Sequence, residues 1–408
     1  MSNTCLFQTG VADMSPASFV HAHASHTDWH VALSECQSRI EAQIAARAAQ
    51  NDECPPFTLG WCYLTDHYAP AAEAILDTLH ASLPGIAWVG TVGVGVAANG
   101  IEYIDEPAVV LMVAPLARES FRLFSGLQPL PPKSSGFTPH TALVHAEATT
   151  PDVQELLQEL SERTATGYLF GGLSSGRNRT LHLADAVLTG GLSGVAFGPE
   201  VGLISRVTQG CQPIGPVRTI TQGGHDLVVA LDHEPALACV LQDLGLDADL
   251  SDEELAEALS KTLVGLSTGA EDVPRWPGQF GPDTLVRHLV GVDPQQQILA
   301  IGDLIEPGTH LAFCTRDPAA ARADLVRIAT EIRTELEDGA KGHMAGALYV
   351  SCSGRGGPHF GGRDAELRTL RSVLGDIPLA GFFAGGEIAR DHLYGYTGVL
   401  TVFTTTDA

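Results

Sequence analysis

The stretch Gly381-Phe-Phe-Ala-Gly-Gly386, followed directly by Glu387, is the last of three similar segments in this sequence. The earlier copies are Gly85-Ile-Ala-Trp-Val-Gly90 and Gly167-Tyr-Leu-Phe-Gly-Gly172. Each copy follows a helix-like stretch, and each helix-like stretch follows a strand-like run; these runs are Phe57–Tyr63, Ala142–His145 and Ala347–Cys352. The recurrence predicts an internal repeat of strand–helix–strand units, each ending in G-x-x-x-x-G.

Repeated units of this kind favour an α/β fold, because a helix between two strands allows the strands to run parallel. Ala98-Asn99-Gly100 adds an antiparallel hairpin signal after the first unit. We therefore expect two related domains with mixed β-sheets flanked by helices. The glycines either enclose a site, because they allow close approach of a ligand, or form tight turns, and both interpretations suit the first two copies.

Length and composition narrow the classes of function. A chain of 408 residues is longer than one hydrophobic core usually supports, so two domains are expected. A formal charge of −25, from 48 acidic and 23 basic residues, argues against nucleic acid and anionic membranes as partners. The sequence has no apolar run approaching the ~20 residues of a membrane helix and no signal-peptide pattern at its start, which predicts no membrane insertion and a cytoplasmic location.

The eight cysteines include no C-x-x-C pair, and most are expected to be reduced and buried. Cys211 and Cys352 differ because they lie in or beside glycine-rich loops, where a ligand could reach the thiol. The histidines of His21-Ala-His-Ala-Ser-His26 lack the spacing of a metal motif, so solvated side chains are expected. We predict no metal site and no cofactor.

Two motifs resemble enzyme signatures but lie in the wrong context. Gly172-Leu-Ser-Ser-Gly176 matches the G-x-S-x-G of a nucleophile elbow, yet the residues after it alternate like a strand instead of forming a helix. Gly93–Ala98 matches G-x-G-x-x-A, yet an Asn-Gly turn follows, so no helix N-terminus is available for a pyrophosphate. The sequence therefore disfavours a serine hydrolase and a dinucleotide site.

The third unit carries the strongest site signal. Ser351-Cys-Ser-Gly-Arg355 ends its first strand, and Glu387 follows its second, which brings a thiol, a guanidinium and a carboxylate into neighbouring loops. Arg355 could bind the carboxylate of a ligand in a fork geometry. Alternatively, Arg355 and Glu387 form an internal ion pair that fastens the two loops.

Three stretches resemble the FIST family: Gln209-Gly-Cys-Gln-Pro-Ile-Gly215, Ser351–Arg355 and Pro378–Ile388, in the family's order. The resemblance implies a FIST N-terminal domain over 27–232 and a FIST C-terminal domain over 233–408, after a loop segment over 1–26. It also implies small-ligand sensing in signal transduction, with amino acids as suggested ligands, and a signalling protein as partner.

We therefore expect reversible binding of an amino acid or a similar carboxylate metabolite, and not catalysis. The expected binding residues lie in the glycine-rich loops: Cys211, Cys352, Arg355, Gly385, Gly386, Glu387, Gly171 and Gly172. Two alternatives remain. One is a thiol-dependent enzyme that uses Cys352 or Cys211 as nucleophile, and the other is a protein-interaction scaffold.

Overall fold

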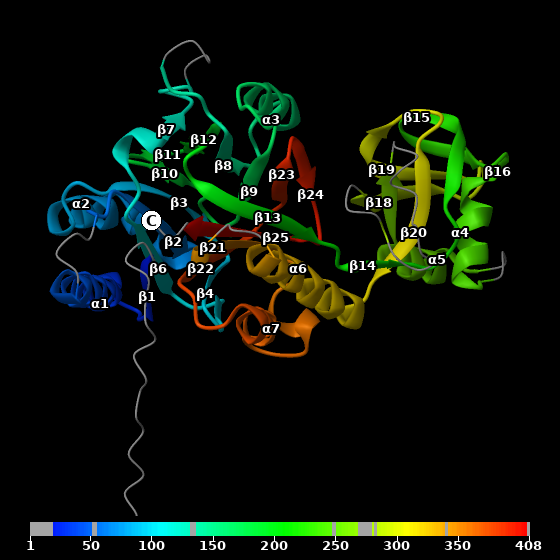
Figure 1. Ribbon diagram of the computed structural model, residues 1–408. Helices are drawn as coiled ribbons and strands as arrows, with labels where there is room; N and C mark the ends of the chain where they lie inside the picture. The colour runs from blue at the N-terminus through cyan, green and yellow to red at the C-terminus, as the bar shows by residue number, and fades with distance from the viewer. Residues whose placement is uncertain are drawn as a thin grey trace, which may run out of the picture.

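The structure is a computed structural model, and it describes residues 19–50, 55–130, 136–246, 250–267, 280, 284–338 and 342–405. Its larger part, which we call the body, contains three six-stranded sheets (Figure 1). A smaller unit, which we call the barrel, stands beside the body and is joined to it near β14 (Figure 1). The α/β class with mixed sheets flanked by helices is confirmed.

Each of the three predicted units forms a parallel strand pair joined by a helix, so the internal repeat is confirmed. The units are β2 (Leu59–Thr65), α2 (Ala72–Ser82) and β3 (Ala87–Gly93); β8 (Thr141–Glu147), α3 (Val153–Glu162) and β9 (Leu169–Ser174); and β21 (His343–Cys352), α7 (Ala365–Leu374) and β22 (Leu379–Ala384). Each sheet of the body contains one unit.

Antiparallel strands complete the three sheets. The first sheet adds β1 (Val20–Ser25), β6 (Ala108–Ala114), β10 (His182–Ala184) and β11 (Val187–Leu188); the second adds β7 (Phe121–Ser125), β12 (Leu192–Phe197), β23 (Glu387–Arg390) and β24 (His392–Tyr394); the third adds β4 (Gly95–Ala98), β5 (Ile101–Ile104), β13 (Gly202–Thr208) and β25 (Gly398–Thr405). The predicted hairpin joins β4 to β5, with Gly100 at φ 76° in its turn.

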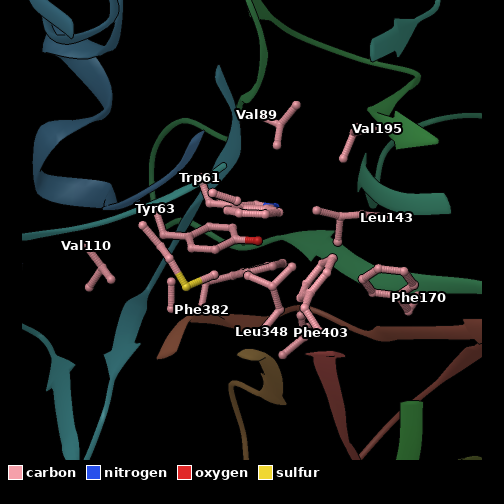
Figure 2. Close-up of a cluster of buried hydrophobic side chains, with 14 of the residues drawn as sticks. Trp61, Tyr63, Val89, Val110, Leu143, Phe170, Val195, Leu348, Phe382 and Phe403 are labelled. Atoms are coloured by element: carbon pink, nitrogen blue, oxygen red, sulfur yellow. The ribbon is translucent and has the colours of Figure 1, made fainter. Parts of the chain in front are cut away.

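The three sheets share one hydrophobic core. Trp61 and Val89 of the first sheet, Leu143 of the second, and Phe382 and Phe403 of the third lie together in it (Figure 2). The outer faces are covered by helices: α1 (Trp29–Gln50) and α2 on the first sheet, α3 on the second, and α6 (Pro318–Asp338) and α7 on the third. Short 3-10 helices are η1 (Asp66–Ala71), η2 (Arg118–Ser120) and η3 (Gly357–Phe360).

One glycine recurs at the same place in each parallel pair. A Cβ atom on Gly90, Gly171 or Gly381 would lie 1.8 to 1.9 Å from a backbone oxygen of the partner strand. Only glycine fits at such a distance, so close packing of strands, and not a turn, explains these residues. Because Gly381 opens its G-x-x-x-x-G copy whereas Gly90 closes its own, the three copies are not structurally equivalent, although the units are.

The barrel was not anticipated from the sequence. Its elements are β14 (Cys211–Pro213), β15 (Arg218–Leu231), β16 (Glu234–Pro235), α4 (Ala236–Leu244), α5 (Asp252–Ser260), β17 (Leu263–Ser267), β18 (Leu285–Asp293), β19 (Ile298–Ile305) and β20 (His310–Arg316). The order β20-β17-β18-β19-β15 closes on itself because β15 also pairs with β20. The helices α4 and α5 pack against its core.

The structure changes two expectations about organisation. The expected N-terminal loop ends too late, because Val20–Ser25 form β1 and pair with β6; residues 1–18 lie outside the described part. The expected boundary at 232/233 falls between β15 and β16, inside the barrel. Strands from both sides of that point also share the third sheet, so the two domain ranges remain predictions about the sequence, and their elements intermix in space.

Candidate functional site

The glycines of the second and third units meet Glu387 where the second and third sheets adjoin. Glu387 in β23 lies opposite Gly172 in β9. Gly385 donates its backbone N–H to the Leu173 carbonyl at 3.0 Å, and the Gly386 carbonyl accepts from the Leu173 N–H at 2.8 Å. The structure therefore brings together residues predicted from two different repeats.

Packing explains the two glycines of β9. A Cβ on Gly171 would lie 1.9 Å from the Val144 carbonyl oxygen, and one on Gly172 would lie 2.8 Å from the Val350 side chain. Neither glycine lies in a tight turn, so that alternative is wrong for Gly171 and Gly172. A ligand contact at these two positions remains a prediction.

Arg355 is buried, with 1% of its surface exposed, and its partner is Glu366 of α7. The Arg355 Nε donates to Glu366 Oε1 at 2.9 Å, and one terminal nitrogen donates to the Thr208 hydroxyl. The suggested ion pair between Arg355 and Glu387 is therefore replaced by one between Arg355 and Glu366. The other terminal nitrogen, Nη2, has no hydrogen-bond acceptor among the described residues.

Glu366 was missed by the sequence analysis, although it organises this region. Its carboxylate is fully buried and also accepts hydrogen bonds from the hydroxyls of Tyr349, at 2.6 Å, and Ser351, at 3.0 Å. Glu102 lies next to it and accepts from the backbone N–H groups of Glu366 and Leu367, at the beginning of α7. Burial, together with the charge of Glu366, raises the pKa of Glu102 to about 7.

Glu387 is also fully buried, and its Oε2 accepts from the backbone and hydroxyl of Thr397 at 3.1 and 2.8 Å. Its Oε1 has no hydrogen-bond donor among the described residues. Burial raises the pKa of Glu387 to about 8, and the hydrogen bonds and the charge of Arg355 offset this rise only in part. At neutral pH this carboxyl group is therefore mostly protonated.

The two candidate cysteines lie beside this acid and the arginine. The Cys352 backbone N–H donates to the Thr397 carbonyl at 3.0 Å, and Thr397 in turn donates to Glu387. Burial and the neighbouring Glu387 raise the pKa of the Cys352 thiol to about 12, which disfavours a thiolate nucleophile. Cys211 is buried at the junction of body and barrel, where it packs with Cys314.

Tyr396, which the sequence analysis did not single out, connects these groups to a cavity. Its backbone carbonyl accepts from Arg355 at 3.5 Å, its hydroxyl hydrogen-bonds His288 of the barrel, and the Arg316 guanidinium lies 5.0 Å from its ring centroid. Tyr396 has φ 60°, a left-handed conformation that is uncommon for a residue with a side chain.

The cavity beside Tyr396 has a volume of about 830 Å³ and lies between the body and the barrel. On the body side it is lined by Ser353, Gly354, Gly356 and His359, which flank Arg355 in sequence. This volume is within the range of small-molecule sites. Arg355, Glu387, Cys352 and Cys211 do not line the cavity; they lie around Tyr396 and Gly354, which form its wall.

The serine-nucleophile motif has a structural role. The Ser174 hydroxyl hydrogen-bonds Thr91 at 2.6 Å, and the Ser175 hydroxyl accepts from the Val94 N–H at 2.9 Å. The chain then continues to β10 without a helix, as the sequence indicated. Gly93–Ala98 likewise leads into the β4–β5 hairpin, so a dinucleotide site is not formed there.

Comparisons with known proteins show which family the sequence matches. A model of the FIST N domain matches residues 58–234, and a model of the FIST C domain matches residues 236–390. An uncharacterized protein of Mycobacterium tuberculosis is 33% identical over 383 residues, which cover 90% of this chain and 96% of that protein. An uncharacterized protein of Mycobacterium bovis is 30% identical over 383 residues, covering 90% and 95%.

Among the described residues, no helix is long and apolar enough to cross a bilayer. The same residues contain no group of three or more histidine, cysteine or acidic side chains placed to hold a metal ion.

Proposed function

The chain belongs to the FIST family, and from that membership we propose that it senses an amino acid or a similar carboxylate metabolite at the cavity beside Tyr396. FIST domains form a sensory, signal-transduction family and bind small ligands. The ligand type, a cytoplasmic location and the signalling partner belong to the proposal. The signal would leave through a separate protein or through a change in assembly.

One observation carries the amino-acid assignment. Arg355 Nη2 and Glu387 Oε1 are both buried and both lack a hydrogen-bond partner among the described residues. Buried polar atoms are nearly always paired, so these two single unpaired atoms favour a ligand that supplies a partner to each. The two side chains adjoin the same segment, since Arg355 donates to the Tyr396 carbonyl and Glu387 accepts from Thr397. The carboxylate of an amino acid would accept from Arg355, and its ammonium group would donate to Glu387.

The side chain of Tyr396 must move for a ligand to pass from the cavity to these two groups, because both are fully buried. Its hydrogen bond to His288 and its contact with Arg316 hold the side chain in its present place. Both contacts join the body to the barrel. Binding would therefore change the junction between the two units, which gives the sensor a response that a partner could detect.

The test is a thermal-shift screen of amino acids and related metabolites, preceded by native mass spectrometry of the purified chain. A ligand at ~100 times its dissociation constant adds roughly 2.7 kcal/mol to stability. The matched variants are Glu387→Gln, which keeps the shape of the neutral acid but cannot gain charge, and the double variant Arg355→Gln/Glu366→Gln, which removes both buried charges together.

We expect Glu387→Gln to weaken amino acids more than simple carboxylates, and the double variant to abolish the shift for both. A library that shifts neither the wild type nor any variant would refute the proposal. The alternative thiol enzyme makes a different prediction, since Cys352→Ala would then remove turnover by orders of magnitude instead of weakening binding modestly. The scaffold alternative predicts no ligand.

A further inference from the structure

The charge of the cavity beside Tyr396 indicates more about the ligand, and this inference rests on the proposed function. The described residues that line the cavity include Lys261, Arg316, His288 and His359, and none of the described lining residues is acidic. The barrel contributes the first three of these side chains, and the loop after Arg355 contributes His359.

Composition does not explain this lining, because acidic residues outnumber basic ones by 48 to 23 in the chain. Four other cavities of the described part each have at least one acidic lining residue; these residues are Asp303 and Asp391, Glu102 and Glu106, Glu35, and Glu335. A basic cavity on a protein with a formal charge of −25 attracts anions locally while the rest of the surface repels them.

Arg316 is the cation best placed to meet a ligand. Its guanidinium donates to the Gly354 carbonyl and lies over the Tyr396 ring, and no carboxylate of the described residues forms an ion pair with it. Lys261 is exposed and lies 2.7 Å from Glu257, so its charge is partly compensated. A carboxylate or phosphate group would give Arg316 the fork-shaped partner that it lacks.

The two histidines of the lining add hydrogen-bonding groups to the cavity. Burial, together with the charges of Arg316 and Arg355, lowers the pKa of His359 to about 4, so this imidazole is neutral at pH 7. His288 already hydrogen-bonds the Tyr396 hydroxyl through Nε2. The hydroxyls of Ser260, Thr315 and Ser353 add polar groups to the same lining.

We propose that the ligand carries a second anionic group: its amino-acid end reaches Arg355 and Glu387 beyond Tyr396, and a distal carboxylate or phosphate is bound in the cavity by Arg316 and Lys261. The ligand class is therefore an acidic amino acid or a close derivative. An uncharged side chain would leave the Arg316 guanidinium without an anionic partner, and a basic side chain would be repelled by both cations.

The experiment compares acids with their neutral amides by isothermal titration of the full chain, using L-glutamate against L-glutamine and L-aspartate against L-asparagine. Each pair differs by one charge at nearly constant shape. We expect the acid to bind about five to ten times more tightly than its amide at low salt, as two partly exposed cations would provide. Raising NaCl from about 20 mM to about 300 mM should reduce that ratio.

Variants locate the effect. Arg316→Gln should reduce the acid-to-amide ratio to near one, Arg316→Lys should keep part of it, and Lys261→Gln should lower it about twofold because Lys261 is exposed and already paired. If Arg316→Gln does not fold, Arg316→Lys and the salt dependence still test whether Arg316 binds the second anionic group.

Equal binding of acid and amide, or a neutral or basic amino acid as the tightest ligand of the screen, would overturn this inference while the proposed function stands. Failure of all four compounds and of the whole screen would overturn both.

Discussion

Two buried glutamates beside Arg355 should lose very different amounts of stability on the same substitution. Glu366 and Glu387 are both fully buried. Glu366 lies 2.9 Å from the Arg355 Nε and accepts two further hydroxyl hydrogen bonds, whereas Glu387 forms no ion pair in the described structure, and burial raises its pKa to about 8. Replacing each with glutamine removes a negative charge in the first case and almost none in the second at pH 7.

The magnitudes follow from this difference. Glu366→Gln leaves the Arg355 cation buried without its counter-charge, which should cost about 3–5 kcal/mol of the free energy of unfolding. Glu387→Gln replaces a mostly neutral acid by a group of the same shape, so its cost should stay below about 1 kcal/mol.

Urea unfolding followed by tryptophan fluorescence measures this difference, because Trp61 and Trp88 are fully buried in the body. The far-ultraviolet circular dichroism of each variant controls for an unfolded starting state. Equal costs for the two variants, or a larger cost for Glu387→Gln, would show that the assigned charges of these two side chains are wrong.

Two further predictions concern pH and strand packing. Burial raises the pKa of Glu387 to about 8 and of Glu102 to about 7, so the folded state holds these protons more firmly than the unfolded chain. The free energy of unfolding should therefore fall as pH rises from about 4.5 to about 8. In urea titrations, Glu387→Gln should remove up to about 1.4 kcal/mol per pH unit of that slope. A pH profile that is identical in the variant would contradict this assignment. Gly381→Ala should cost about 3 kcal/mol of stability or prevent folding, because its Cβ would lie 1.8 Å from the Tyr349 carbonyl oxygen. The control is Gly224→Ala, whose Cβ would have no atom within 4 Å and which should change the melting temperature little. Similar melting temperatures for both variants would refute the packing argument.

Local patterns in the sequence were sufficient to predict the repeat. A strand run, a helix and a second strand suffice to define each parallel pair, and Asn99-Gly100 defines the β4–β5 hairpin. The proximity of Cys352, Arg355 and Glu387 follows from the same rule, since parallel neighbours end at the same edge of a sheet. These predictions depend on interactions between residues that are close along the chain.

The remaining features depend on contacts between distant segments. The barrel closes through pairing of β15 with β20, about which a local pattern says nothing. Tyr396 gains its position from Arg316 and His288 of the barrel. Glu366 did leave a signal: it shares the i, i+4, i+8 spacing of Leu370 and Leu374, and an acid on the buried face of a helix indicates a buried partner.

The position of β25 affects how the chain can fold during synthesis. This final described strand lies inside the third sheet, between β13 and β21, where Gly202 pairs with Thr404. At about 5–20 residues per second, the ribosome needs roughly 10–40 s to reach β25 after completing β13. The barrel can form in that interval, whereas the third sheet must wait until β25 has been synthesised, with the β25-facing edge of β13 unpaired until then.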